Sequence, residues 1–327
     1  MFTPAKSICV VAIVASTHFS LAAEQPTDRP SSAVVAPYLD EQTLLVAHLD
    51  LAAFDAPQTV DWLAELLDLP ERVRDSLQAQ AAPINVVIQH LAKDSSADVF
   101  IVGSLADAGR LPFFLLLPLD GKTPAAAIAG EARREIEKAW NRPLATEEVG
   151  GALVTASQET IDRLKRGKPA DRPEVAAALT AAGGGAVQLA FVPPAALGKL
   201  VETILPQLPQ SLGGGATKIF TQGGLWVAAG VDLPPEEIAI RVVVQSADAA
   251  SALALQDELA RFFTAVGKLP QVSEAVPEFG ELSARLLPKA AGDQLKLELT
   301  EENGGVDALA AIVAPLSRVV VTAFAGR

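Results

Sequence analysis

The chain has 327 residues, half of them hydrophobic, and carries 26 basic against 39 acidic side chains, a formal net charge of −13. An acidic balance without any lysine or arginine cluster argues against nucleic acid and anionic membrane surfaces as partners. The length predicts two domains or one large one, with enough aliphatic side chains for a sizeable core.

The start of the chain has the three parts of a secretory signal peptide. Lys6 is its one cation, an uncharged apolar run follows from Ser7 to Ala22, and a second small residue, Ala23, precedes Glu24. The run is short for a membrane span and is followed by a polar stretch. We expect cleavage after one of the two alanines and an extracytoplasmic location, whether periplasmic, envelope or secreted. A retained anchor is the alternative.

Cleavage would remove the sole cysteine, Cys9, and leave His48 and His90 as the histidines of the mature chain. A chain without thiols forms no disulfide, no thiolate metal site and no cysteine nucleophile. We therefore expect a disulfide-free protein without a cofactor, stabilised by its apolar core.

Hydrophobic periodicity predicts alternating strands and helices. In chain order, the first half has strands at 43–51, 99–105, 111–119 and 151–156, and helices at 52–69, 70–91 and 123–140, with a short one after Ser157. The second half has strands at 186–192, 225–231, 238–245 and 294–299, and helices at 194–208 and 248–263.

The second half repeats the order of the first. The block 100–138 aligns on 226–264 without a gap, at a single shift of 226 − 100 = 126. A constant shift preserves strand alternation and helix phase, so Phe114 and Ile240 are expected in matching places. Two copies of a β-α-β-β-α-β unit are the economical interpretation.

The predicted fold is therefore α+β, with two tandem ferredoxin-like (β-α-β-β-α-β) modules whose antiparallel sheets are covered by helices. The expected segments are a signal peptide at 1–23, a disordered leader at 24–37, modules at 38–170 and 171–305, and a C-terminal helix at 306–327. Arg318 lies inside the apolar C-terminal segment, so we expect a packed amphipathic helix and no transmembrane span.

Two triple-glycine runs, at 183–185 and 213–215, are interpreted as flexible connectors. A phosphate-binding loop requires Gly-Lys-Ser/Thr at its end, and neither run continues in that way. No serine lies in a G-x-S-x-G or S-x-x-K context, and no EF-hand loop is present. The sequence therefore assigns no catalytic and no cofactor-binding residue.

His48 and Asp50 are the two candidate site residues. They lie two apart in a predicted strand, so both side chains point to one face, where they could bind a metal or act as a general base. Two ligands are too few for a tight site, and no H-x-x-x-H or H-E-x-x-H pattern supplies others. The preferred interpretation is a structural histidine near a strand-end aspartate.

The segment PYLDEQTLLVAHLDLAAF, the paired strands and the late Ala/Leu-rich helix resemble a loose group of uncharacterised exported bacterial proteins that carry a domain of unknown function. The resemblance is one of pattern and brings no functional residues. It implies an exported, non-catalytic protein.

Two hypotheses about function follow. The first is a non-enzymatic envelope or periplasmic protein that binds an unidentified protein or small molecule between or beside its sheets. The alternative is a hydrolase or metal-assisted enzyme with dispersed residues around His48 and Asp50. Further polar groups converging with these two in a concave pocket would favour the enzyme.

Overall fold

The computed structural model describes residues 31–94, 98–109, 111–119, 137, 143–233 and 238–325. The expected signal peptide, the first residues of the expected leader and nearly all of the expected helix at 123–140 lie outside these residues.

The described strands form one ten-stranded sheet in the order β4-β5-β3-β2-β1-β6-β7-β8-β10-β9. The first five are β1 (Thr43–Asp50), β2 (Asp98–Ser104), β3 (Phe113–Pro118), β4 (Ala145–Val149) and β5 (Ala152–Ala156). The other five are β6 (Val187–Phe191), β7 (Trp226–Asp232), β8 (Ala239–Gln245), β9 (Lys289–Ala291) and β10 (Gln294–Thr300). The fold is thus α+β with an antiparallel sheet.

The two halves of the chain meet at a seam between β1 and β6, where Val46 lies opposite Ala190. Outward from this seam the order is β1-β2-β3-β5-β4 on one side and β6-β7-β8-β10-β9 on the other. The matching order supports the predicted duplication, which stays a prediction.

The strand pairing differs from the expected ferredoxin-like modules. A β-α-β crossover places two parallel strands in one sheet, whereas each neighbouring pair among the described strands is antiparallel. The two halves also share one continuous sheet. Element order along the chain does not fix pairing, because a helix between two strands can return the chain in either direction.

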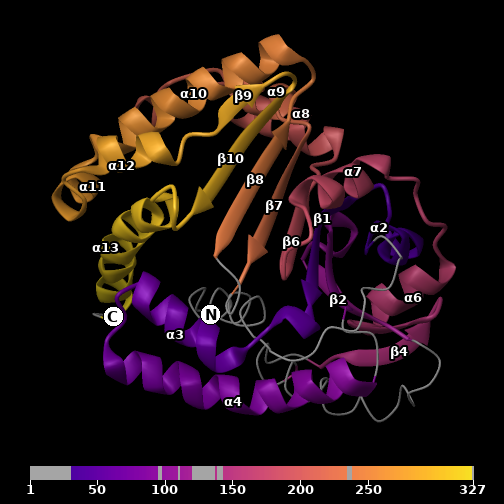
Figure 1. Cartoon of the computed structure of the whole chain (residues 1–327). Helices are drawn as coiled ribbons and strands as arrows, with labels where there is room; N and C mark the ends of the chain where they lie inside the picture. The colour runs from indigo at the N-terminus through magenta and orange to yellow at the C-terminus, as the bar shows by residue number, and fades with distance from the viewer. Residues whose placement is uncertain are drawn as a thin grey trace.

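The helices lie on both faces of the sheet (Figure 1). In the first half they are α2 (Ser31–Val35), α3 (Ala56–Leu66), α4 (Glu71–Asp94) and α6 (Gln158–Arg166), with short 3-10 turns η1 (Ala36–Tyr38), η2 (Leu51–Ala53) and η3 (Leu105–Asp107). The second half has α7 (Pro173–Ala182), α8 (Ala195–Ile204), η4 (Gln210–Leu212), α9 (Lys218–Gly223), α10 (Ala249–Gly267), α11 (Pro270–Ala275), α12 (Phe279–Arg285) and α13 (Gly305–Ala325). None of the described helices is long and apolar enough to cross a membrane.

Local sequence explains where several helices begin. Asp55, Ser157 and Asp248 each accept a hydrogen bond from a backbone N–H in the first turn, at the start of α3, α6 and α10 respectively. Short polar side chains at this position satisfy N–H groups that have no partner inside the helix.

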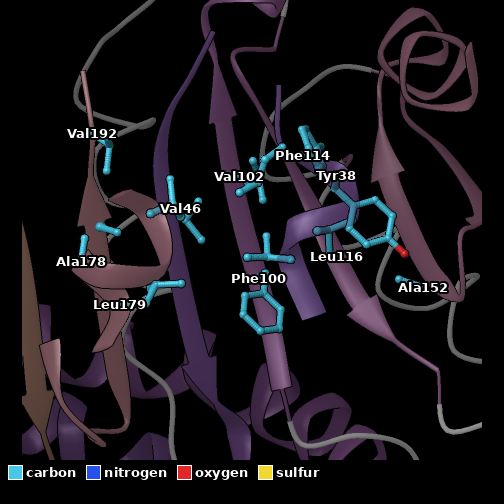
Figure 2. Packing of buried hydrophobic residues seen from close by; sticks show 14 of the residues in the cluster. Tyr38, Val46, Phe100, Val102, Phe114, Leu116, Ala152, Ala178, Leu179 and Val192 are labelled. Atoms are coloured by element: carbon cyan, nitrogen blue, oxygen red, sulfur yellow. The ribbon is translucent and has the colours of Figure 1, made fainter. Parts of the chain in front are cut away.

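The main core lies on the sheet face covered by α2, α6 and α7. Figure 2 shows Phe100, Val102, Phe114 and Leu116 of the β2–β3 hairpin in this layer, with Leu179 of α7 near the seam. The opposite face packs against α3, α9, α10 and α13 in smaller clusters. Burial of these side chains on both faces is the main stabilising term.

The expected match between Phe114 and Ile240 is wrong. Phe100 pairs with Leu116, 16 residues later (116 − 100), whereas its counterpart Trp226 pairs with Gln245, 19 residues later (245 − 226). The pairing register of the second hairpin is therefore shifted by three residues relative to the first, and an odd shift moves side chains to the other face. Phe114 lies in the main core, while Ile240 packs on the opposite face.

The last residues of the expected disordered leader form regular structure. Residues 31–38 form α2 and η1, and Val35 is fully buried in the main core. The proline and serine content of this segment favoured disorder, but the pair Val34 and Val35 supplies an apolar face that packs with α7.

A buried polar network ties the β2–β3 hairpin to α6. Asp107 is fully buried, accepts a hydrogen bond from Thr160 Oγ1 at 2.9 Å and pairs with Arg163 Nη2 at 2.5 Å. The same guanidinium also pairs with Asp40, before β1. A buried carboxylate is tolerated when it is paired and hydrogen-bonded in this way.

Candidate functional site

His48 lies near the end of β1, at the seam between the two halves. Its ring stacks on Phe100 at 4.7 Å between centroids, and the residue is 7% exposed. Residues two apart in a strand share a face, so Asp50 lies on the same face, as predicted.

Two residues that were not predicted complete the surroundings of His48. Nε2 lies 2.7 Å from Asp98 Oδ1 on β2, and Nδ1 lies 3.2 Å from Gln188 Oε1 on β6. His48 and Gln188 are paired across the seam, and Asp98 is paired with Asp50. These partners are 50 and 140 residues away in the chain, so only the strand register brings them together.

The side chain of Gln188 is oriented by its other contact. Its Nε2 donates a hydrogen bond to the backbone carbonyl of Gly183, at the end of α7, so its Oε1 faces His48. The opposite amide orientation would place two acceptors against each other. Both ring nitrogens of His48 therefore face oxygen acceptors, one on each neighbouring strand.

The Asp50 carboxylate is hydrogen-bonded to the backbone next to it. Its Oδ1 accepts a hydrogen bond from the backbone N–H of Ala52 at 2.9 Å and so begins the turn η2. Burial raises the pKa of the Asp50 carboxyl, and the charge of Asp98 raises it further, while the Ala52 N–H and His48 oppose this change. The described residues contain no group of three or more His, Cys, Asp or Glu side chains that could hold a metal ion.

This geometry favours the structural interpretation of His48. Its ring is buried on Phe100, both nitrogens have partners, and those partners come from the strands on either side. The cluster joins β2, β1 and β6 at one end of the seam. A reacting group needs access to a substrate, and this ring is enclosed.

A cavity of about 560 Å³ lies elsewhere, between α10 and the turn η4. Its polar side chains are Gln210, Ser211, Arg261, Thr264 and Lys268. Gly213, Ala260, Ala265 and Leu269 supply the rest of its wall. A concave space of this size with a few convergent polar groups is typical of sites for small molecules.

A buried acid, Glu258, positions one of the cations of this cavity. Its Oε2 lies 2.5 Å from Nη2 of Arg261, and the pair is held by charge, because the N–H groups are not aligned for a hydrogen bond. Lys268 forms no ion pair within the described part of the chain. The cavity therefore has an unneutralised positive charge.

The triple-glycine run at 213–215 is not the flexible connector that was expected. A Cβ on Gly215 would lie 1.7 Å from Glu258 Oε1, and Gly213 and Gly214 have φ values of +102° and +71°. The run thus follows a path that only glycine allows, packed directly against α10. The sequence showed the glycines, but Glu258, which Gly215 approaches closely, is more than forty residues later.

No family model matches the chain. No curated protein matches it either. Among solved structures, crystal form III of TP0453 has 11% sequence identity and a TM-score of 0.37, over 89% of this chain and 99% of that one. Crystal form I of TP0453 has 11% identity and a TM-score of 0.36, over 88% of this chain and 100% of that one. Scores this low carry no inference about function.

Proposed function

We propose that the protein is an exported, non-enzymatic binding protein of the periplasm or envelope, and that its ligand occupies the cavity between α10 and η4. The observation that carries this proposal is the convergence of Arg261, Lys268 and Ser211 on one hollow of about 560 Å³. Export rests on the signal-peptide pattern at the start of the sequence.

The chemistry of the wall indicates a small organic acid as the ligand. Arg261 and Lys268 are the two charged side chains of the wall, and both are cations. Glu258 neutralises the first, and the second is without an ion-pair partner among the described residues. Ala260, Ala265 and Leu269 offer apolar surface to the body of such a ligand. An acidic group would contact the cations, and an aliphatic chain the alanines and the leucine.

The alternative of a hydrolase or metal-assisted enzyme around His48 and Asp50 is less well supported. Acid–base catalysis needs the reacting nitrogen within hydrogen-bond reach of a substrate. Both nitrogens of His48 already contact protein groups, and Asp50 caps a turn. Polar groups do converge on His48, but its ring is buried, with 7% of the residue exposed.

Calorimetric titration with octanoate tests the proposal, with octan-1-ol as the uncharged control of similar shape. We expect octanoate to bind and Lys268→Ala to weaken it by about tenfold, the usual effect of losing one charge-assisted hydrogen bond. Lys168→Ala, an exposed lysine outside the cavity, is the matched control and should bind as the unmodified chain does.

Equal binding of octan-1-ol would contradict the acidic-ligand class. Unchanged octanoate affinity in Lys268→Ala, or no binding at all, would contradict the cavity as the ligand site.

A further inference from the structure

The helix α8 has an unusual environment, because none of its residues is buried. Four apolar side chains at its end and just beyond are exposed, with Leu200 at 54%, Val201 at 36%, Ile204 at 73% and Leu205 at 39%. We call these four residues the α8 stripe.

The stripe occupies one face of the helix. Its members follow the spacing i, i+1, i+4 and i+5, which places them side by side. The face that contacts α9 is a different one: Gly198 lies against Thr221, and Glu202 accepts hydrogen bonds from Thr221 and Gln222. The stripe therefore lies on a different face of α8 from the one that contacts α9, and Leu200 and Ile204 are its most exposed members.

The size of the stripe bears on what could cover it. Its exposed fractions correspond to about 400 Å² of apolar surface, an area at which patches on monomeric proteins are often functional. Two copies facing each other would bring together about 800 Å². Interface cores are about 65% apolar, so the complete contact would bury about 1,200 Å², the lower end for a specific interface.

Charge within the stripe does not oppose a second copy as the occupant. Two chains of net charge −13 repel each other over most of their surface. A two-fold contact places each residue opposite the same patch of its partner, so any charge inside the patch would meet its own kind. The stripe contains no charged residue, and the nearest acid, Glu202, is hydrogen-bonded to α9.

The geometry points to α8 as a homodimer interface, in which the stripes of two copies pack against each other across a two-fold axis. This assembly is independent of the proposed ligand cavity, whose wall contains none of the four residues.

Sedimentation equilibrium of the protein over about 5–200 µM tests the inference, since an interface of this size is expected to have a micromolar Kd. We expect a monomer–dimer equilibrium that tightens as salt screens the repulsion between copies. The double variant Val201→Thr with Ile204→Thr should weaken the dimer by at least tenfold. Both side chains are exposed, so its far-UV circular dichroism should match that of the unmodified chain.

Leu253→Thr is the matched control, because Leu253 is 57% exposed on α10, outside the stripe. It should leave the dimer unchanged. A chain that stays monomeric at the highest concentration would overturn the inference, and so would a control variant that dissociates as much as the double variant.

Discussion

His48 on β1 and Gln188 on β6 lie directly opposite each other across the seam, with Nδ1 and Oε1 3.2 Å apart. One residue belongs to each half of the chain, so this contact helps to join the two halves into one sheet. At the other end of the seam, Arg172 donates hydrogen bonds to the carbonyls of Thr43 on β1 and Val192 after β6. Polar contacts thus flank the apolar pair Val46 and Ala190 on both sides.

The first prediction concerns His48. His48→Gln removes the contact with Asp98 at 2.7 Å and should lower the free energy of unfolding by about 1.5–3 kcal/mol, the range for a hydrogen bond to a charged group. Urea denaturation measures this loss. Because the role of His48 is structural, the content of bound divalent metal, measured by elemental analysis, should not change. Loss of a stoichiometric metal in the variant would show a metal site instead.

The second prediction concerns the pH dependence due to Asp50. Burial raises the pKa of this carboxyl above its usual value of 3.8, so the folded state binds a proton more readily than the unfolded state. Stability from this residue is therefore greatest at low pH and decreases as pH rises through the folded pKa.

Asp50→Asn should remove that decrease, because asparagine keeps an oxygen to accept from Ala52 and has no charge. Relative to the unmodified chain, the variant should be more stable near neutral pH, by under about 1 kcal/mol because the partly open site is screened. Near pH 3.5 the difference should vanish. Urea midpoints at the two pH values measure it, and a variant that is less stable at neutral pH would contradict the assignment.

The third prediction concerns Asp107. Asp107→Ala removes a fully buried partner of Arg163 and Thr160. It should lower the free energy of unfolding by about 3 kcal/mol, the lower end of the range for breaking a buried ion pair, because Arg163 still pairs with Asp40. Asp162→Ala, which truncates an exposed aspartate of α6, the helix that carries Thr160 and Arg163, should lower the free energy of unfolding by less than about 0.5 kcal/mol. Equal thermal stability of the two variants would show that the network contributes little.

The fourth prediction concerns the glycine run beside the cavity. Gly215→Ala places a methyl group against Glu258 and should lower the free energy of unfolding by about 1–3 kcal/mol. Gly184→Ala is the matched control from the other run, because a Cβ there meets nothing within 4 Å. It should be close to neutral. Chemical denaturation of both variants measures the contrast, and similar losses would mean that the close approach to Glu258 is relieved without strain.

The strands that could be predicted from the sequence are those with apolar runs. The predicted segments 43–51, 99–105, 186–192 and 238–245 agree closely with β1, β2, β6 and β8. The strands β4 and β9 were missed, since ATEEV and KAA are short and lack a buried apolar set. Both lie at the edges of the sheet, where polar residues are common.

The pairing between strands was harder to predict. The three-residue difference in register is not visible as a gap in the alignment, because the two blocks have the same length and differ only in which residues pair. An odd difference nevertheless exchanges the two faces of β8. A sequence pattern specifies alternation within a strand, but the neighbouring strand decides the register.

The candidate sites show the same difference between what local sequence predicts and what only the fold brings together. His48 and Asp50 were recognised because they are close in the sequence, whereas Asp98 and Gln188 required the register. The cavity wall combines η4 with the end of α10, about fifty residues later, and its residues form no motif. Charged residues near a helix end are usually solvated, so Arg261 and Lys268 gave no sign of a shared site.

The most direct test of the proposed function is to map octanoate binding by the amide ¹H–¹⁵N chemical-shift changes that it causes. We expect changes concentrated in the segments 210–213 and 260–269, which contain the wall of the cavity, and their loss in Lys268→Ala. Changes centred on His48, or spread evenly over the surface, would contradict a ligand site between α10 and η4.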